Sequence, residues 1–320
     1  MKLSHLALRG VAALPDLERD FISASTGRPH DLIVIAGPAA SGKTRLCDLM
    51  LAVFETIGSY HGIVHASDWY ADAARGARAE LGLWLDEGGN GVGAAPTSRA
   101  VVDFTARGVH SMVDRAAGRV LSRYDHDPAH GKREYFPENR QRAWGARSDG
   151  LGAPEQSLLR SSKDPQKYSF VPRFLAELRT HAAHRDAFAS KLELLSPTVR
   201  YTPAARGGDP TACFTNKTRA SVLYEELSSS EADAVLIAAT ATMIGLNHSI
   251  VFLDRPELYV APDRLVAWMQ SLLRLGANNQ WIVATSDEGL ASAVDRSAVV
   301  NLGRNDPMPA AAPRASWMPS

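Results

Sequence analysis

The sequence predicts an α/β fold with a mostly parallel core sheet and an inserted lobe of helices and strands. Short apolar runs of the type buried in parallel sheets, such as Leu32–Ala36 and Ser249–Leu253, occur near both ends of the chain and are separated by helical patterns. The first run leads directly into GPAASGKT, Gly37–Thr44, which fits the phosphate-binding P-loop pattern. The expected division is a nucleotide-binding core at 1–68 and 246–304, an inserted lobe at 69–245 and a disordered tail at 305–320.

The N-terminal part begins with residues that alternate between apolar and polar, a strand pattern. Lys2–Leu8 is expected to form one strand and Ala12–Phe21 a second, both antiparallel and both before the P-loop strand. Arg45–Ile57 has the apolar spacing of a helix and follows the P-loop. The other elements expected here are a short strand at Gly62–Ala66, a glycine-rich loop at Gly88–Pro96 and a helix over Ala100–Leu121.

The middle of the chain, 124–167, is polar and rich in Pro, Gly, Arg and Asp, which predicts an irregular segment with one short strand at Glu134–Pro137. Helical and apolar patterns return after it. The expected elements are a mostly helical stretch Val171–Leu194, side-sheet strands within Leu192–Tyr201 and Cys213–Leu223, helices at Ser229–Ile244 and Pro262–Leu275, and strands at Trp281–Thr285 and Ser297–Leu302.

Composition excludes several classes of protein. Lys plus Arg and Asp plus Glu number 35 each, so net charge gives no argument for a nucleic-acid or membrane partner. The N-terminal residues do not form a secretory signal, and no apolar stretch is long enough for membrane insertion. The two cysteines, Cys47 and Cys213, have no metal-site spacing. We therefore expect a cytoplasmic protein.

The P-loop residues have defined chemical roles. Gly37 and Gly42 allow a tight turn and a close approach of backbone to phosphate, and the loop amides together with the next helix N-terminus attract anions. Lys43 reaches the β- and γ-phosphates of a nucleotide, and the Thr44 hydroxyl is a ligand for Mg²⁺. The expected nucleotide contacts are Gly37, Pro38, Ala39, Ala40, Ser41, Gly42, Lys43, Thr44 and Arg45.

Two further motifs lie in the C-terminal half. Ser249–Leu253 is an apolar strand followed by Asp254, which suits a carboxylate that holds Mg²⁺ beside the P-loop, although such an Asp can also cap the next turn. Ser228, Ser229, Ser230 and Glu231 precede an apolar helix. Its hydroxyls and first amides form an anion site, or, alternatively, an ordinary serine N-cap with an acidic first turn.

These motifs, in this order, resemble ABC-type ATPases of the SMC, DNA-repair and OLD-like group, within the AAA-family ATPases. The opening MKLSHLALRG…DLERDF…HDLIVIAGPAASGKT is similar to their N-terminal region, and LSSSE to their signature, usually LSGGQ or LSSGE. SIVFLDRPELYVAP resembles their Walker B segment, and WIVATSDEGL their switch strand. REYFPENR loosely resembles the strand and loop near the γ-phosphate, which places Arg140 among the nucleotide contacts. The resemblance covers about 1–60 and 220–303.

The resemblance implies ATP and Mg²⁺ held between two heads in a head-to-tail homodimer, or in a heterodimer with a related head. One chain would supply Gly37–Thr44 and Asp254, and the other Ser228–Glu231. Dimer closure would drive a partner, which the resemblance suggests is a protein effector or DNA.

Three residues depart from the pattern of this group. Arg255 stands where a catalytic glutamate usually follows the Walker B aspartate, and an arginine cannot accept a proton from water. Ser286 replaces the switch histidine, and Ser230 replaces a signature glycine. Glu257 lies two residues further on and is the candidate to polarise water, or else a surface carboxylate. We expect a catalytic set of Lys43, Glu257 and Ser286 with slow or lost hydrolysis.

Other functions remain open from sequence alone. Asp68, in the run ASDWY, resembles the proton-accepting aspartate of uridine-kinase-like enzymes, which would make the chain a small-molecule kinase. The substituted residues also suit a subunit that binds ATP as a structural ligand without hydrolysing it. A basic, aromatic segment suggests DNA contact, or alternatively a solvated loop or an ATP contact; its residues are Arg133, Tyr135, Arg140, Arg142, Trp144 and Arg147.

Overall fold

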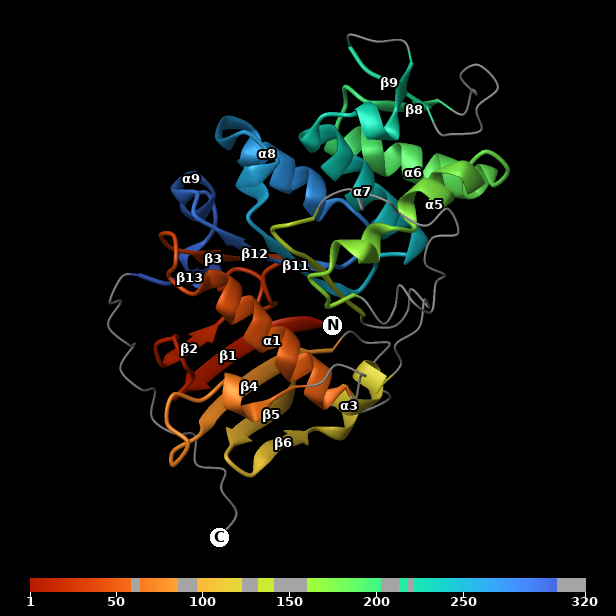
Figure 1. Ribbon diagram of the computed structural model, residues 1–320. Helices are drawn as coiled ribbons and strands as arrows, with labels where there is room; N and C mark the ends of the chain where they lie inside the picture. Colours follow the sequence, from red (N-terminus) through yellow and green to blue (C-terminus); the bar gives the residue numbers. More distant parts are fainter. Residues whose placement is uncertain are drawn as a thin grey trace.

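The chain folds into stacked layers around a central parallel sheet. Figure 1 shows an antiparallel sheet below, helix α1 (Lys43–Ile57) packed on it, the parallel sheet across the middle, and further helices on the opposite face. The α/β class expected from sequence is confirmed. The computed structural model describes residues 1–58, 64–85, 97–122, 132–140, 160–202, 213–217 and 221–303.

The N-terminal sheet has five strands in the order β2-β1-β4-β5-β6, and each strand is antiparallel to its neighbour. The two antiparallel strands expected before the P-loop are therefore present. The second is shorter than expected because the chain turns at Gly10 and Ala13, both with positive φ. The strands are β1 (Lys2–Arg9), β2 (Leu17–Asp20), β4 (Ala77–Trp84), β5 (Thr97–Thr105) and β6 (Gly108–Val113).

The prediction of a helix over Ala100–Leu121 is wrong for most of that range. These residues form β5 and β6, joined by a short turn before Gly108, and helix α3 spans only Arg115–Ser122. On β5, Ala100, Val102 and Phe104 are fully buried on one face. Pairing with β4 and burial of these side chains outweigh the weak helical spacing of the segment.

The parallel sheet has the order β13-β3-β12-β11-β7, and every neighbouring pair is parallel. This agrees with the parallel core expected from short apolar runs. It also brings the strand expected at 134–137 into the core sheet as an outer strand. The strands are β3 (Leu32–Ala36), β7 (Lys132–Phe136), β11 (Ser249–Asp254), β12 (Gln280–Thr285) and β13 (Val299–Asn301).

The apolar strands of this sheet contribute side chains to two separate hydrophobic cores. Successive side chains point to opposite faces of a strand. Ile33 and Phe252 therefore pack with α1 and the antiparallel sheet, whereas Val34 and Val251 pack with the helices on the other side. A sheet covered on both faces needs apolar residues at every position, which explains the unbroken runs in the sequence.

The second helical layer lies over the opposite face from α1, as Figure 1 shows. A three-stranded sheet, β10-β9-β8, extends from it. Its helices are α5 (Val171–Glu177), α6 (Ala182–Leu195), α7 (Ser229–Met243), α8 (Pro262–Leu273) and α9 (Glu288–Ser292), and its strands are β8 (Arg200–Thr202), β9 (Cys213–Thr215) and β10 (Val222–Leu223).

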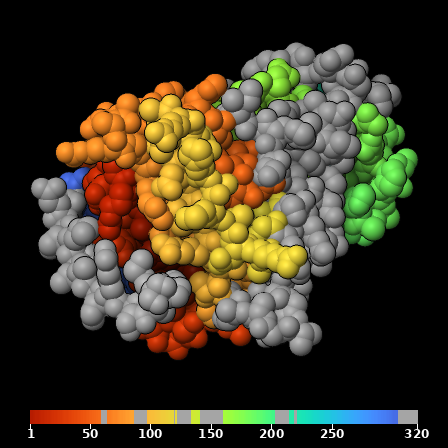
Figure 2. Space-filling model, turned by 90° about the horizontal axis from the view of Figure 1, so that it is seen from below, coloured from red at the N-terminus to blue at the C-terminus, as the bar shows by residue number. Residues whose placement is uncertain are grey.

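Strand pairing divides the range 69–245, expected to be one inserted lobe. Strands β4, β5 and β6 belong to the sheet of β1, and β7 belongs to the parallel sheet, so these strands lie outside the layer of α5–α7. Seen from below in Figure 2, β5, β6 and α3 occupy much of one outer face. The strand expected at 62–66 lies partly outside the described residues, and Ala66 begins the short helix η1 (Ala66–Asp68). The loop at 88–96 and the tail from 305 also lie outside them.

No helix in the described part of the chain is both long and apolar enough to cross a membrane.

Candidate functional site

The P-loop joins the end of β3 to the start of α1, and its two key glycines are required by packing. A Cβ on Gly37 would lie 2.0 Å from the carbonyl oxygen of Leu302. Gly42 has φ 94° as the N-cap of α1, and a Cβ there would lie 2.9 Å from the Leu14 side chain. Any larger residue at either position would push the loop away from β13 or from the turn after β1. The loop shape is therefore fixed by both neighbouring sheets.

Lys43 lies folded back over this loop. Its ammonium donates to the carbonyl oxygens of Gly37, at 2.8 Å, and Pro38, at 2.7 Å. Burial lowers the pKa of Lys43, while the carboxylates of Glu257 and Asp254 act in the opposite direction. A cation held at the centre of the loop by neutral carbonyls is well placed to exchange them for phosphate oxygens.

Thr44 and Asp254 meet at the carboxyl end of β11. The Thr44 hydroxyl donates to Asp254 Oδ2 at 2.7 Å, and the Tyr135 hydroxyl lies 3.4 Å from the same oxygen. The other oxygen, Oδ1, is buried without a hydrogen-bond partner. Burial raises the pKa of Asp254, and the Thr44 hydrogen bond opposes this shift.

The donor set at this point fits Mg²⁺. A threonine hydroxyl and a carboxylate with an unused buried oxygen are the hard oxygen ligands that this ion prefers. The described residues contain no group of three or more His, Cys, Asp or Glu that could hold a metal. A site with one or two protein ligands is the form that Mg²⁺ takes when phosphates and water complete its coordination. The expected pair Thr44 and Asp254 is therefore brought together.

Glu257 lies in the short helix η4 (Pro256–Leu258) and bonds the loop after β12. Its Oε1 accepts from the Ser286 amide at 3.0 Å and from the Ser286 hydroxyl at 2.8 Å, and its Oε2 accepts from the Thr285 hydroxyl at 2.8 Å. Partial burial acts to raise the pKa of Glu257, but these hydrogen bonds outweigh it and the pKa lies below its ordinary value. The structure thus brings the expected residues Glu257 and Ser286 into direct contact.

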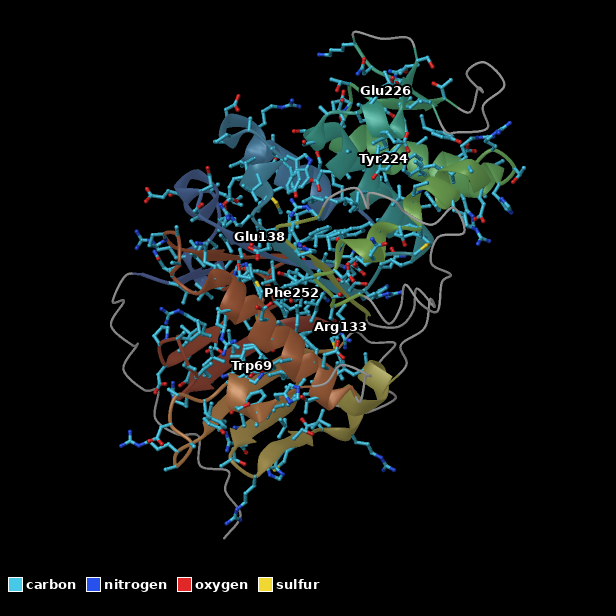
Figure 3. The ribbon with its side chains drawn as sticks, viewed as in Figure 1. Trp69, Arg133, Glu138, Tyr224, Glu226 and Phe252 are labelled. Atoms are coloured by element: carbon cyan, nitrogen blue, oxygen red, sulfur yellow. The ribbon has the colours of Figure 1, made fainter. Side chains whose placement is uncertain are left out.

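Arg255 turns away from β11 in a left-handed conformation, with φ 48° and ψ 59°. Its amide donates to the carbonyl of Ala284 at 2.8 Å. Its guanidinium Nη1 donates to Oε2 of Glu138 at 3.1 Å, and the hydroxyl of Tyr259 donates to the Glu138 carbonyl at 2.9 Å. Glu138 follows β7 and was not among the residues expected from sequence. Figure 3 labels Arg133 within β7 and Glu138 beyond its far end.

The signature-like residues begin α7 on the other side of the parallel sheet from α1. Ser228 and Glu231 form a capping box, in which the Ser228 amide donates to Glu231 Oε2 at 2.9 Å and the Ser228 side chain accepts from the Glu231 amide. The Ser230 hydroxyl donates to the carbonyl of Tyr259. Ser228, Ser229 and Ser230 are exposed, and a cavity of about 430 Å³ opens beside them. The capping role considered from sequence is therefore present.

Solved structures resemble this arrangement. The chain is similar to the SMC head domain from Thermotoga maritima, with a TM-score of 0.52 and 14% identity over 94% of each chain. It is also similar to an SmcHead bound to the C-winged helix domain of ScpA, with a TM-score of 0.58 and 11% identity over 94% of each chain. A third match is the Smc head domain with an extended coiled coil, bound to the C-terminal domain of ScpA derived from Pyrococcus furiosus. Its TM-score is 0.55, with 12% identity, and it covers 93% of this chain and 92% of that one.

The chain has the fold of an SMC head domain. This is an ABC-type P-loop ATPase fold, as the ordered motifs indicated. No family model matches the chain, and no curated protein was found to be similar to it.

Within the SMC-head fold, Arg140 has a structural position. It is buried, and its Nε donates to Asp233 Oδ1 at 2.7 Å while its Nη1 donates to the Asp254 carbonyl at 2.6 Å. The guanidinium also lies over the ring of Tyr259, 4.3 Å from its centre. Burial raises the pKa of Asp233, although the charge of Arg140 opposes this. Arg140 therefore connects the loop after β7 to α7 and β11.

The basic segment expected to contact DNA does not present its described members to solvent. Arg133, Tyr135 and Arg140 are all buried, and Arg133 donates to the carboxylate of Glu55 at 2.5 Å. These three residues are therefore not available to phosphates or bases, which corrects the sequence expectation for them. Arg142, Trp144 and Arg147 lie outside the described residues.

Arg45 and Asp68 meet beside the first turn of α1. The Arg45 guanidinium donates to the backbone carbonyl of Asp68 and lies over the Trp69 ring, 4.1 Å from its centre. The Asp68 side chain is exposed. Nothing in this contact positions the carboxylate for a substrate hydroxyl, so the site gives the kinase alternative no support. Of the remaining loop residues, Ser41 has a buried hydroxyl without a partner, and Ala40 has φ 61°.

Proposed function

We propose that this chain is an ABC-type head that binds Mg-ATP, dimerises through the nucleotide and hydrolyses it slowly. The observation that carries the proposal is the 2.7 Å hydrogen bond between the Thr44 hydroxyl and Asp254, directly behind a P-loop whose glycines admit no side chain. The likeness in fold to SMC heads supports the same assignment.

The proposed nucleotide contacts follow from the atoms that are available. Loop amides from Gly37 to Gly42 would cradle the phosphates, and Lys43 would exchange its two carbonyl partners for phosphate oxygens. Thr44 and Asp254 would hold Mg²⁺, which supplies neutralisation of phosphate charge. Arg45 and the Trp69 ring on which it lies flank the start of α1.

A dimer is proposed because the two halves of the expected ATP site lie in different layers. The P-loop begins α1 on one face of the parallel sheet, and Ser228–Glu231 begins α7 on the other face. In a head-to-tail pair, the exposed serines of one chain would face the P-loop nucleotide of its partner. Two of the similar SMC heads are bound to ScpA domains, and for this chain we propose a protein effector, or DNA, as the partner that dimer closure acts on.

Slow hydrolysis is proposed from the state of the side chains near the γ-phosphate position. Arg255 cannot accept a proton, and both carboxylate oxygens of Glu257 are already hydrogen-bonded to Thr285 and Ser286. The same observation favours the alternative of a subunit that keeps ATP as a structural ligand. Intact ATP remaining on the purified protein, with no ADP formed over hours, would support that alternative.

The proposal is tested by measuring ATP binding and molecular mass together. Equilibrium binding of a fluorescent ATP analogue and sedimentation velocity should both be run with and without Mg²⁺. We expect binding that is lost in Lys43→Ala and Thr44→Ala, and dimers that form in Mg-ATP but not in Mg-ADP. A wild-type chain that binds no ATP, or that binds it and stays monomeric, would contradict the proposal.

A further inference from the structure

A carboxylate that the sequence motifs did not indicate lies at the nucleotide end of the parallel sheet. Strands β7 and β11 are parallel, with Phe136 opposite Leu253. The residues after Phe136 therefore leave the sheet beside Asp254, one strand spacing or about 5 Å away. Glu138, two residues beyond Phe136, comes to the same edge as the Thr44–Asp254 pair. Figure 3 shows its position beyond the end of β7.

Glu138 and Arg255 hold each other in place at this edge. Oε2 of Glu138 accepts from Nη1 of Arg255 at 3.1 Å, and the Glu138 backbone is fixed by the Tyr259 hydroxyl at 2.9 Å. Arg255 is held in the left-handed region, which costs a residue with a Cβ about 1–2 kcal/mol, and its amide bonds the Ala284 carbonyl. This backbone conformation directs the Arg255 side chain to β7.

The two candidate carboxylates at this edge differ in what they already bond. Glu257 has hydrogen bonds on both oxygens, all from Thr285 and Ser286. Glu138 is half exposed, at 47%, and among the described residues its carboxylate is bonded by Arg255 alone. Glu138 therefore keeps a free oxygen and access to water, whereas Glu257 serves to connect η4 to the loop after β12.

We propose that Glu138 is the catalytic carboxylate for ATP hydrolysis in this chain, and that Arg255 is its positioning residue. This inference rests on the proposed function. In this chain the acidic residue stands after β7 instead of after the neighbouring strand β11, and the cation of Arg255 follows Asp254 at the end of β11. The exchange keeps one carboxylate beside the γ-phosphate position and adds a cation that offsets negative charge there.

Glu138 would assist the attack of water on the γ-phosphate of ATP. The oxygen of a water bonded to Glu138 forms a bond to the γ-phosphorus of ATP. The bond from that phosphorus to the β,γ-bridging oxygen breaks, and its electron pair stays on ADP. One water proton passes to the Glu138 carboxylate and then to solvent, and phosphate leaves with the other hydrogen.

The test compares Glu138→Gln with a matched pair elsewhere on the surface. Glu177 accepts from Arg173 at 2.8 Å on α5, with exposure close to that of the Glu138–Arg255 pair, and is the control. Phosphate release, ATP affinity and dimer mass should be measured on the whole chain. We expect Glu138→Gln to lower turnover about 100-fold or more, with ATP affinity unchanged and the ATP-bound dimer longer-lived. Glu177→Gln should match the wild type in all three.

Arg255 is tested by rescue. Arg255→Ala should lower turnover about 10-fold, because Glu138 is no longer held in place. Arg255→Lys should recover part of the loss, which a purely structural role would not predict. Thermal unfolding of each variant shows whether it folds.

Three outcomes would overturn the proposal in distinguishable ways. Glu138→Gln that binds ATP and turns it over at the wild-type rate would remove Glu138 from catalysis while leaving the proposed function intact. A larger loss in Glu257→Gln than in Glu138→Gln would return the role to Glu257. A folded wild-type chain that binds no ATP would refute the proposed function itself.

Discussion

Glu257 shows how one side chain can join two segments at the edge of the parallel sheet. Three hydrogen bonds from Thr285 and Ser286 converge on its carboxylate. Hydrogen bonds to a charged group contribute more than neutral ones, about 1.5–3 kcal/mol each. These hydrogen bonds keep the carboxylate ionised despite partial burial, because they lower its pKa. The orientation of the loop after β12 therefore depends on the charge of Glu257.

Replacing this carboxylate should cost stability in a way that depends on pH. Glu257→Gln should lower the free energy of unfolding by about 1–3 kcal/mol at pH 7, because one amide donor would face the donors of Thr285 or Ser286. The pKa of Glu257 is lowered in the folded chain from 4.5. Its contribution is therefore complete above that value and is lost as the pH falls through the lower, folded-state pKa. Urea unfolding of both proteins from pH 7 to pH 3 measures this.

The difference between the two proteins should shrink as the pH falls below about 4.5. A difference that stayed constant over the whole range would mean that the charge of Glu257 is not what holds the loop. Glu193→Gln, at an exposed carboxylate on α6, provides the control for a general effect of removing one negative charge.

Single residues of the site were predictable to the degree that their roles are local. Gly37, Lys43 and Thr44 follow from a motif of contiguous residues. The Thr44–Asp254 contact was predictable because Asp254 ends the core strand β11 and Thr44 closes the P-loop motif that follows the core strand β3. The Arg255–Glu138 pair was not, because it depends on the register of β7 against β11, and nothing in the local sequence determines that register.

At the scale of elements, the buried side chain of Gln280 connects the two large sheets. Its Oε1 accepts from the Leu3 amide at 2.6 Å, and its Nε2 donates to the carbonyls of Leu3, at 2.9 Å, and His30, at 2.8 Å. Leu3 lies on β1 at a break in the pairing with β4. Gln280 thus supplies the backbone partners that the irregular strand lacks.

Gln280→Ala should therefore destabilise the fold by about 3 kcal/mol, because it leaves a buried amide and two carbonyls without partners. Gln270 on α8 is exposed and is the matched control, for which we expect a change within about 0.5 kcal/mol. Chemical unfolding followed by tryptophan fluorescence measures both. A loss below about 1 kcal/mol for Gln280→Ala would show that β1 is held to the parallel sheet by other contacts.

Strands were predictable where both of their faces are buried in the parallel sheet, and less predictable in the antiparallel sheet. The unbroken apolar runs of β3, β11 and β12 predicted the parallel core. Residues 100–113 carry apolar side chains at mixed spacing, and the pairing of β5 with β4 and of β6 with β5 makes them strands. Periodicity over a short window does not contain this long-range information.

At the scale of the whole molecule, the parallel sheet separates the two halves of the proposed ATP site. The P-loop and Asp254 converge at its carboxyl edge, while the exposed serines at the start of α7 belong to the layer on the opposite face from α1. One chain would then present an incomplete site, and completion would require a second chain. This separation makes a prediction that binding by a single chain does not make.

The prediction concerns a mixture of two defective variants. Lys43→Ala should remove nucleotide binding in its own P-loop but keep intact serines, and Ser230→Glu should place a negative charge where the partner's γ-phosphate would lie. Each variant alone should fail to dimerise in Mg-ATP. A mixture should form heterodimers with one complete site, made from the Ser230→Glu P-loop and the Lys43→Ala serines.

Sedimentation velocity in Mg-ATP, with one variant fluorescently labelled, measures this complementation. About half of the molecules in an equal mixture meet an unlike partner at random, so a dimer fraction well above that of either variant is expected. The Ser230 hydroxyl bonds the Tyr259 carbonyl, so Ser230→Ala serves as the control for losing that bond without adding charge, and it should still dimerise. A mixture that stays monomeric while wild type dimerises would show that the serines and the P-loop do not share a nucleotide across the interface.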